Sequence, residues 1–266
     1  MFFVLALGSS WAIWRFAVQA SQEEGREGEA FLYNFVGLLG PALIAFLMNM
    51  FSGKSMRKDY FSRLFGLRRI NFLFVLITFT IPPLIVYGST WLSLQFGQSA
   101  DQYKFAADPS QLIPLIIIAL ILAPTIEELG WRGYGMDSLR AKMSPLGASL
   151  MFGVLWSLWH APLVLIHGTY HYELAHMDTP IYLINFFVSV VAAAVFVNWI
   201  YYKHHRSIFG VMLAHAVLNW WSISLQTTQF TKCIITGAYI GVAILIVLFD
   251  RKAFSGGPRN FVEDPE

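Results

Sequence analysis

Residues 110–128 read SQLIPLIIIALILAPTIEE, a long apolar run that ends in two glutamates. The hydrocarbon core of a bilayer is about 30 Å thick and takes about 20 apolar residues to cross as a helix. Runs of this kind recur along the chain and predict an all-α, polytopic membrane helical bundle of about eight transmembrane helices. The predicted spans are 2–20, 31–51, 70–96, 110–128, 146–167, 180–202, 207–225 and 234–249.

The composition excludes the common soluble classes. Of the 266 residues, 13% are charged and 56% hydrophobic, whereas an ordinary globular protein has about 25% charged residues. The mean hydropathy is +0.56. A net charge of +2 does not suit a nucleic-acid binder, and a single cysteine, Cys233, cannot form an internal disulfide. Membrane lipids are therefore expected partners, and nucleic acid is not.

The loop charges predict an orientation. Lys and Arg number six in the loop after the second predicted span and one in each of the loops on either side of it, and low and high counts continue to alternate. Basic loops stay in the cytoplasm. We therefore expect both termini to be cytoplasmic, which requires an even number of spans. The short loops favour a prokaryotic cytoplasmic membrane.

The chain reads as one integral-membrane domain, 1–266, without a linker or repeat. The first predicted span contains Arg15, and we expect it to be retained, because it lacks the basic start of a signal peptide. The last span is short, at about 16 residues. The basic stretches 54–69 and 203–206 are expected to lie on anionic lipid.

Two glutamates and an arginine interrupt the pattern of apolar spans. Glu127 and Glu128 continue the fourth span directly and Arg132 follows, so we place them at the cytoplasmic end of that span. Glu128 and Arg132 are four residues apart and can pair along one helix face. Glu127 lies about 100° around the helix and is free to face another partner. An interfacial charge cluster would also explain the motif.

Three further polar residues lie within predicted spans, where such groups are costly. His160 is followed by Pro162, which can open the helix beside the imidazole. His215 and Asn219 are four residues apart and share a helix face. Each of these groups, taken alone, could serve only to form hydrogen bonds between helices. Together with the acids and the arginine, on three separate helices, they suggest a site.

The three motifs resemble those of the CPBP intramembrane proteases, also called the Abi or CAAX-protease family. That family shows Glu-Glu-x-x-x-Arg, then an aromatic-x-x-x-His motif, then His-x-x-x-Asn or His-x-x-x-Asp. Here the first motif begins at Glu127, the second joins Trp156 to His160, and the third joins His215 to Asn219. The match covers a core of about 120–225. Trp156 stands where the family more usually has Phe.

The resemblance implies an intramembrane endopeptidase acting on a membrane-associated peptide or protein, including prenylated CAAX-like substrates. It implies Glu127 as general base, His160 as the residue that positions water, and His215 with Asn219 as stabilisers of the oxyanion or of the substrate carbonyl. Glu128, Arg132 and Trp156 would be supporting residues.

The cofactor question stays open at this stage. Glu127, His160 and His215 could bind zinc or another divalent metal with a water in the fourth position. However, His-Glu-x-x-His is absent and Asn219 suits hydrogen bonding better than zinc. We therefore favour a glutamate-activated water without an obligatory metal.

Two other classes of function remain, a non-catalytic membrane scaffold or chaperone and, less favoured, a transporter. The predicted boundaries also spread Glu127, His160 and His215 over more than about 10 Å of membrane depth. The catalytic hypothesis requires them to converge. His167, His171 and His176 are expected to be solvated in a loop.

Overall fold

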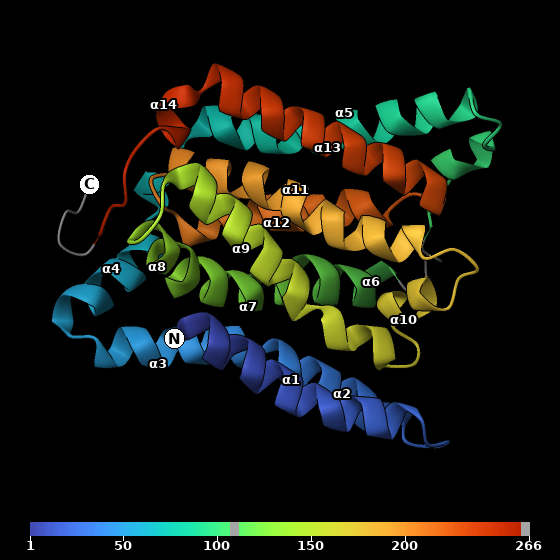
Figure 1. Ribbon diagram of the computed structural model, residues 1–266, viewed down its shortest axis with the longest axis horizontal. Helices are drawn as coiled ribbons and strands as arrows, with labels where there is room; N and C mark the ends of the chain where they lie inside the picture. Colours follow the sequence, from blue (N-terminus) through green and yellow to red (C-terminus); the bar gives the residue numbers. More distant parts are fainter. Residues whose placement is uncertain (107–111, 262–266) are drawn as a thin grey trace.

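The structure, a computed structural model, describes residues 1–106 and 112–261, and the elements within these ranges are helices. The long helices lie side by side along one axis (Figure 1). The main elements are α1 (Phe2–Ser21), α2 (Glu27–Leu38), α3 (Gly40–Phe51), α4 (Lys54–Phe65), α5 (Phe72–Leu94), α6 (Leu112–Leu115), α7 (Ala123–Gly130), α8 (Met136–Arg140), α9 (Pro145–Trp159), α10 (Tyr170–Ala175), α11 (Ile181–Lys203), α12 (Ile208–Ile223), α13 (Gln229–Phe249) and α14 (Arg251–Phe254).

The polytopic helical bundle predicted from the sequence is confirmed. Within the described ranges, seven helical segments are long and apolar enough to cross a membrane. The predicted span 207–225 is the shorter apolar helix α12, of 16 residues. The prediction of a short last span was wrong, because α13 begins at Gln229 and has 21 residues. Positions 110 and 111 of the fourth span lie outside the described residues.

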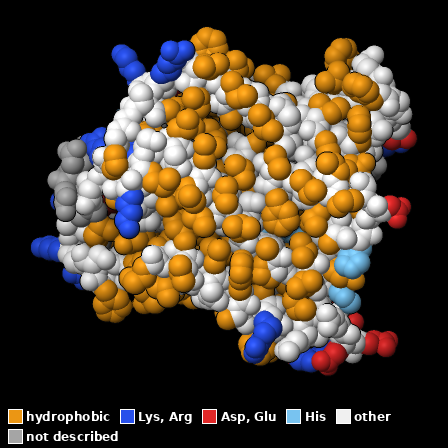
Figure 2. Space-filling model, viewed as in Figure 1, with side chains coloured by type: hydrophobic (Ala, Val, Ile, Leu, Met, Phe, Trp, Pro, Cys, Tyr) orange, Lys and Arg blue, Asp and Glu red, His pale blue; other side chains and the backbone are white. Residues whose placement is uncertain are grey.

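The ends of the bundle differ in charge. The N-terminus and the last helix, α14, lie at the end that carries α4 (Figure 1), and most of the Lys and Arg side chains visible in Figure 2 gather there. Acidic and histidine side chains are visible at the opposite end, near α10 (Figure 2).

The fourth span is longer than predicted, and this changes the depth of the glutamates. A continuous helical segment runs over Leu112–Arg140, with π-helical turns η4 (Ile116–Leu122) and η5 (Trp131–Gly135) on either side of α7. Glu127 and Glu128 therefore lie near the middle of the helix, and their predicted place at its cytoplasmic end was wrong. The charges do not end the helix, because they are paired inside the bundle.

Close packing holds α7 in place against α3. A Cβ atom added at Gly130 would lie 2.5 Å from the carbonyl carbon of Pro41, well inside van der Waals contact. Only glycine leaves room for this approach of the two backbones. The glutamates just before Gly130 are therefore held on a rigid helix within the core.

The basic stretch 54–69 was expected to lie on anionic lipid, but part of it is buried in the bundle. It forms α4, and Arg63 enters the bundle with 1% of its surface exposed. Arg63 donates hydrogen bonds to the carbonyl oxygens of Arg132 (2.6 Å) and Gly133 (2.9 Å). A π-helical turn shifts the hydrogen-bond ladder of a helix, and Arg63 satisfies carbonyls of that turn.

The stretch 203–206 also departs from the expectation. His204 and Arg206 are buried, at 1% and 3% exposure. Arg206 pairs with Asp137 of α8 at 2.6 Å and with Asp59 of α4 at 3.1 Å. Burying a charge costs less free energy when an opposite charge is buried beside it. These ion pairs allow the segment 203–206 to pack into the end of the bundle.

Candidate active site

Glu127 is held by an indole from the neighbouring helix α9. The Nε1–H of Trp156 donates a hydrogen bond to Glu127 Oε2 at 2.9 Å, and Glu127 is 7% exposed. A phenylalanine at position 156, the more usual residue in the resembled family, has no such donor. The departure noted in the sequence therefore adds a contact that orients the carboxylate.

Glu128 lies at the centre of a buried polar network. Its carboxylate oxygens are both 2.9 Å from Arg132 Nη1, as the spacing predicted. His215 Nδ1 lies 2.8 Å from Glu128 Oε1 and joins α12 to α7. Arg132 Nη2 donates to Asn198 Oδ1 of α11 at 3.0 Å. Glu128, Arg132 and Asn198 each have 0% exposure, so this part of the network is removed from solvent, whereas His215 is 5% exposed.

His160 ends α9. The helix stops at Trp159, and Pro162 lies in the 3-10 turn η6 (Ala161–Leu165) that follows. His160 Nδ1 lies 2.8 Å from the carbonyl oxygen of Trp156. A carbonyl only accepts hydrogen bonds, so we assign the proton to Nδ1, which leaves Nε2 of the neutral ring as an acceptor.

His215 and Asn219 share a face of α12, as predicted. Asn219 Nδ2 donates to the carbonyl oxygen of Ala119 at 2.9 Å, and Ala119 belongs to the π-helical turn η4. His215 donates from Nδ1 to the Glu128 carboxylate, which accepts, so the Nε2 edge of the ring is left for another partner.

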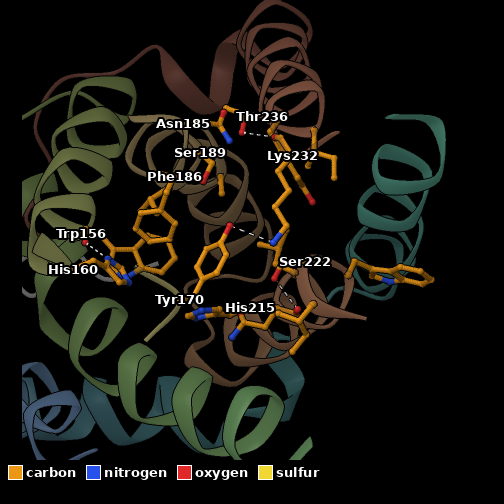
Figure 3. A pocket seen from close by; sticks show the side chains of 18 of the residues that line it. Trp156, His160, Tyr170, Asn185, Phe186, Ser189, His215, Ser222, Lys232 and Thr236 are labelled. Atoms are coloured by element: carbon orange, nitrogen blue, oxygen red, sulfur yellow. Dashed lines mark hydrogen bonds between the residues drawn. The ribbon is translucent and has the colours of Figure 1, made fainter. Parts of the chain in front are cut away.

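The predicted residues converge on one cavity of about 470 Å³. Figure 3 shows Trp156, His160 and His215 around this space, together with Tyr170 and Lys232. Glu127 and Asn219 also line it, whereas Glu128 and Arg132 do not. The sequence predicted that these residues would lie at different depths in the membrane. They lie together because the helical segment that contains α7 continues inside the bundle to Arg140.

One lining residue contradicts the expectation for the loop histidines. His171, on α10, stacks on His160 with ring centroids 5.6 Å apart and planes at 26°. Burial and the neighbouring His160 lower the pKa of His171 to about 3, so its imidazole is neutral near pH 7. His167 and His176 are exposed, as expected.

Several residues near the site had little or no signal in the sequence. Asn198 is one of two asparagines in the apolar helix α11, and Lys232 lies one turn into α13. Intramembrane polar residues are often functional, so these two could have been flagged by that rule. His171 could not, since it lies outside the predicted spans.

A metal ion would need donor atoms from several side chains around one point. Within residues 1–106 and 112–261, no three His, Cys, Asp or Glu side chains lie close enough together to hold one. Glu127 is bonded to Trp156, and Nδ1 of each histidine has a protein partner. Nε2 of each ring stays open, and a bonded Nδ1 is itself common in metal-ligating histidines, so the decisive observation is the distance: Glu127, His160 and His215 do not form a group close enough to hold one metal ion.

Comparison with known proteins identifies the family of the chain. The family model described as type II CAAX prenyl endopeptidase Rce1-like matches residues 109–221, which include all three motifs. The chain is 33% identical to CAAX prenyl protease 2 of Methanococcus maripaludis over 258 residues, 96% of this chain and 94% of the relative. It is 27% identical to lysostaphin resistance protein A of Staphylococcus haemolyticus over 151 residues, 56% of this chain and 38% of that protein.

The chain is a multi-pass helical bundle, its motif residues line one cavity, and it matches this family model. These observations together define a protease integral to the membrane. More narrowly, the chain belongs to the CAAX prenyl protease family. The resemblance noted in the sequence is thereby confirmed.

Proposed function

We propose that this chain is an intramembrane endopeptidase that uses a glutamate-activated water to cleave a membrane-associated, prenylated CAAX-like peptide. The observation that carries the proposal is the convergence of Glu127, His160, His215 and Asn219 on one cavity. The printed name of the Methanococcus relative, a CAAX prenyl protease, supports the substrate class.

In the proposed reaction Glu127 removes a proton from a water molecule held by His160 Nε2. The hydroxide attacks the peptide carbonyl carbon, and Glu127 then gives the proton to the leaving amine as the C–N bond breaks. His215 and Asn219 stabilise the oxyanion. To donate from Nε2, His215 must be doubly protonated, with Nδ1 donating to the Glu128 carboxylate at 2.8 Å.

The orientation is part of the proposal. With the basic end in the cytoplasm, both termini are cytoplasmic, and we place the chain in a prokaryotic cytoplasmic membrane. The cavity reaches Tyr170 and His171 of α10, at the opposite end of the bundle. A peptide therefore reaches the site from that end or from within the bilayer.

The test uses purified protein in liposomes and a synthetic farnesylated peptide that ends in a Cys-aliphatic-aliphatic-Met sequence. We expect mass spectrometry to detect one cut peptide bond in the prenylated peptide and much slower cleavage of the same peptide without its lipid. Intact peptide would contradict the proposal. Peptide moved across the bilayer uncut would favour the transporter, and bound but uncut peptide would favour the scaffold.

We further propose that catalysis needs no metal, because Glu127, His160 and His215 do not form a group close enough to hold one ion. Activity is expected to survive exhaustive treatment with a membrane-permeant chelator, and elemental analysis should find less than stoichiometric metal. Loss of activity that Zn²⁺ restores would overturn this, if stoichiometric zinc binding also disappears in His160→Ala.

A further inference from the structure

Lys232 places a cation on the wall of the cavity. It lies inside the span Gln229–Phe249 and lines the same cavity as Glu127 and His160. Its Nζ donates to the hydroxyl of Tyr170 at 3.2 Å and lies 4.5 Å from the centroid of that ring (Figure 3). The Tyr170 hydroxyl in turn donates to Gln229 Oε1 at 3.0 Å.

The charge of Lys232 has no counter-ion in the part of the chain that the structure describes. Lys104 and Lys203 pair with Asp101 and Asp250, whereas no Asp or Glu there forms an ion pair with Lys232. A lysine near a helix end usually extends toward lipid headgroups. Lys232 instead follows the cavity wall to the Tyr170 hydroxyl, in a part of the cavity that is open to solvent.

The length of the cavity indicates where the anion would lie in a bound peptide. His215, Asn219 and Ser222 line it from one face of α12. At 1.5 Å per residue, His215 and Ser222 are about 10 Å apart along the helix. About three residues of extended peptide span that distance. Ser222 and Lys232 lie on either side of the short 224–228 connection, so Lys232 is at the far end of this wall.

We propose that Lys232, held by Tyr170, binds the carboxylate of the substrate peptide and that this contact sets the distance from the peptide terminus to the cut bond. The inference rests on the proposed function and adds a residue that determines its substrate specificity. The free C-terminal carboxylate fits best, because an extended tail of about three residues would reach from the cut bond to the Lys232 ammonium.

The experiment measures binding separately from cleavage. Glu127→Gln protein in nanodiscs is titrated with two fluorescent farnesylated peptides that differ only in a C-terminal carboxylate or carboxamide. A charged hydrogen bond at this partly exposed place corresponds to roughly a 10-fold difference in Kd, with the acid bound more tightly. Equal Kd values for the two peptides would overturn the inference, whether or not the wild-type protein cleaves either one.

The variants locate the contact. Adding Lys232→Ala should weaken binding of the acid to the level of the amide and leave the amide unchanged. Lys104→Ala is the matched control, because Lys104 lies near the same end of the bundle but is exposed and paired with Asp101; it should keep the full preference. A preference that survives Lys232→Ala would assign the carboxylate to another residue and contradict the proposal.

Two further arms separate the sources of the anion. An amide-terminated peptide that carries Glu at its last position should bind no better than the plain amide, since the side-chain carboxylate is displaced from the terminus. The preference for the acid should also be equal in nanodiscs of neutral and of anionic lipid. A preference that anionic lipid removes would mean that Lys232 binds a lipid phosphate, which would overturn the peptide assignment.

Discussion

Glu127→Gln is expected to lower kcat for peptide cleavage by roughly 10²- to 10⁴-fold, the usual contribution of a general acid–base residue. The amide cannot take a proton from water, yet it keeps the size of the side chain. Its oxygen can still accept the Trp156 Nε1–H that now lies 2.9 Å from Glu127 Oε2. The measurement is single-turnover cleavage of the farnesylated peptide in liposomes.

Two variants accompany this measurement. Glu173→Gln is the matched control, because Glu173 is exposed on α10, and its kcat should stay unchanged. Trp156→Phe removes the indole donor and keeps the aromatic bulk, so we expect a smaller loss together with a shifted pH profile of kcat. Undiminished cleavage by Glu127→Gln, with normal folding, would refute the proposed mechanism.

Arg132→Met is expected to destabilise the folded bundle by about 3–5 kcal/mol, the usual cost of leaving a buried charge without its partner. Arg132 has 0% exposure and binds both Glu128 and Asn198. Its guanidinium also lies 4.4 Å from the Phe152 ring centroid. The measurement is reversible unfolding in mixed micelles, compared with wild type.

The double variant Glu128→Gln/Arg132→Met tests the cause. Removing both charges should recover part of the lost stability, because the Glu128 carboxylate is then no longer buried without its guanidinium partner. Arg26→Met is the surface control: Arg26 pairs with Glu23 and Glu29 in solvent, and its loss should leave the unfolding curve unchanged. An Arg132→Met protein as stable as wild type would show that the pair is not needed for stability.

The sequence allowed the helices and much of the site to be predicted, because both leave local signals. Apolar runs mark the spans, and the spacing of four residues predicted the Glu128–Arg132 pair. The contact of His215 with Glu128 could not be predicted, since it joins helices 87 residues apart. Its geometry depends on how α12 packs against α7, which hydropathy does not encode.

The depth of the glutamates was misjudged for a related reason. In the sequence the stretch after the glutamates resembles a loop, because it contains Arg132, Asp137 and Arg140 and charged residues usually end a membrane span. In the folded bundle Asp137 pairs with Arg206 at 2.6 Å and with Arg63 at 3.2 Å. These partners come from distant segments, so only the tertiary structure shows that the helix continues through its charged residues to Arg140.

The shortness of α12 has a consequence for the surrounding lipid. Its 16 residues span about 24 Å, less than the hydrocarbon thickness of about 30 Å. A helix shorter than the bilayer core creates hydrophobic mismatch, which lipids relieve by local thinning. α12 carries His215 and Asn219 and packs against α5, α7 and α11, so lipid meets it chiefly at its ends, where thinning leaves headgroup water less hydrocarbon to cross.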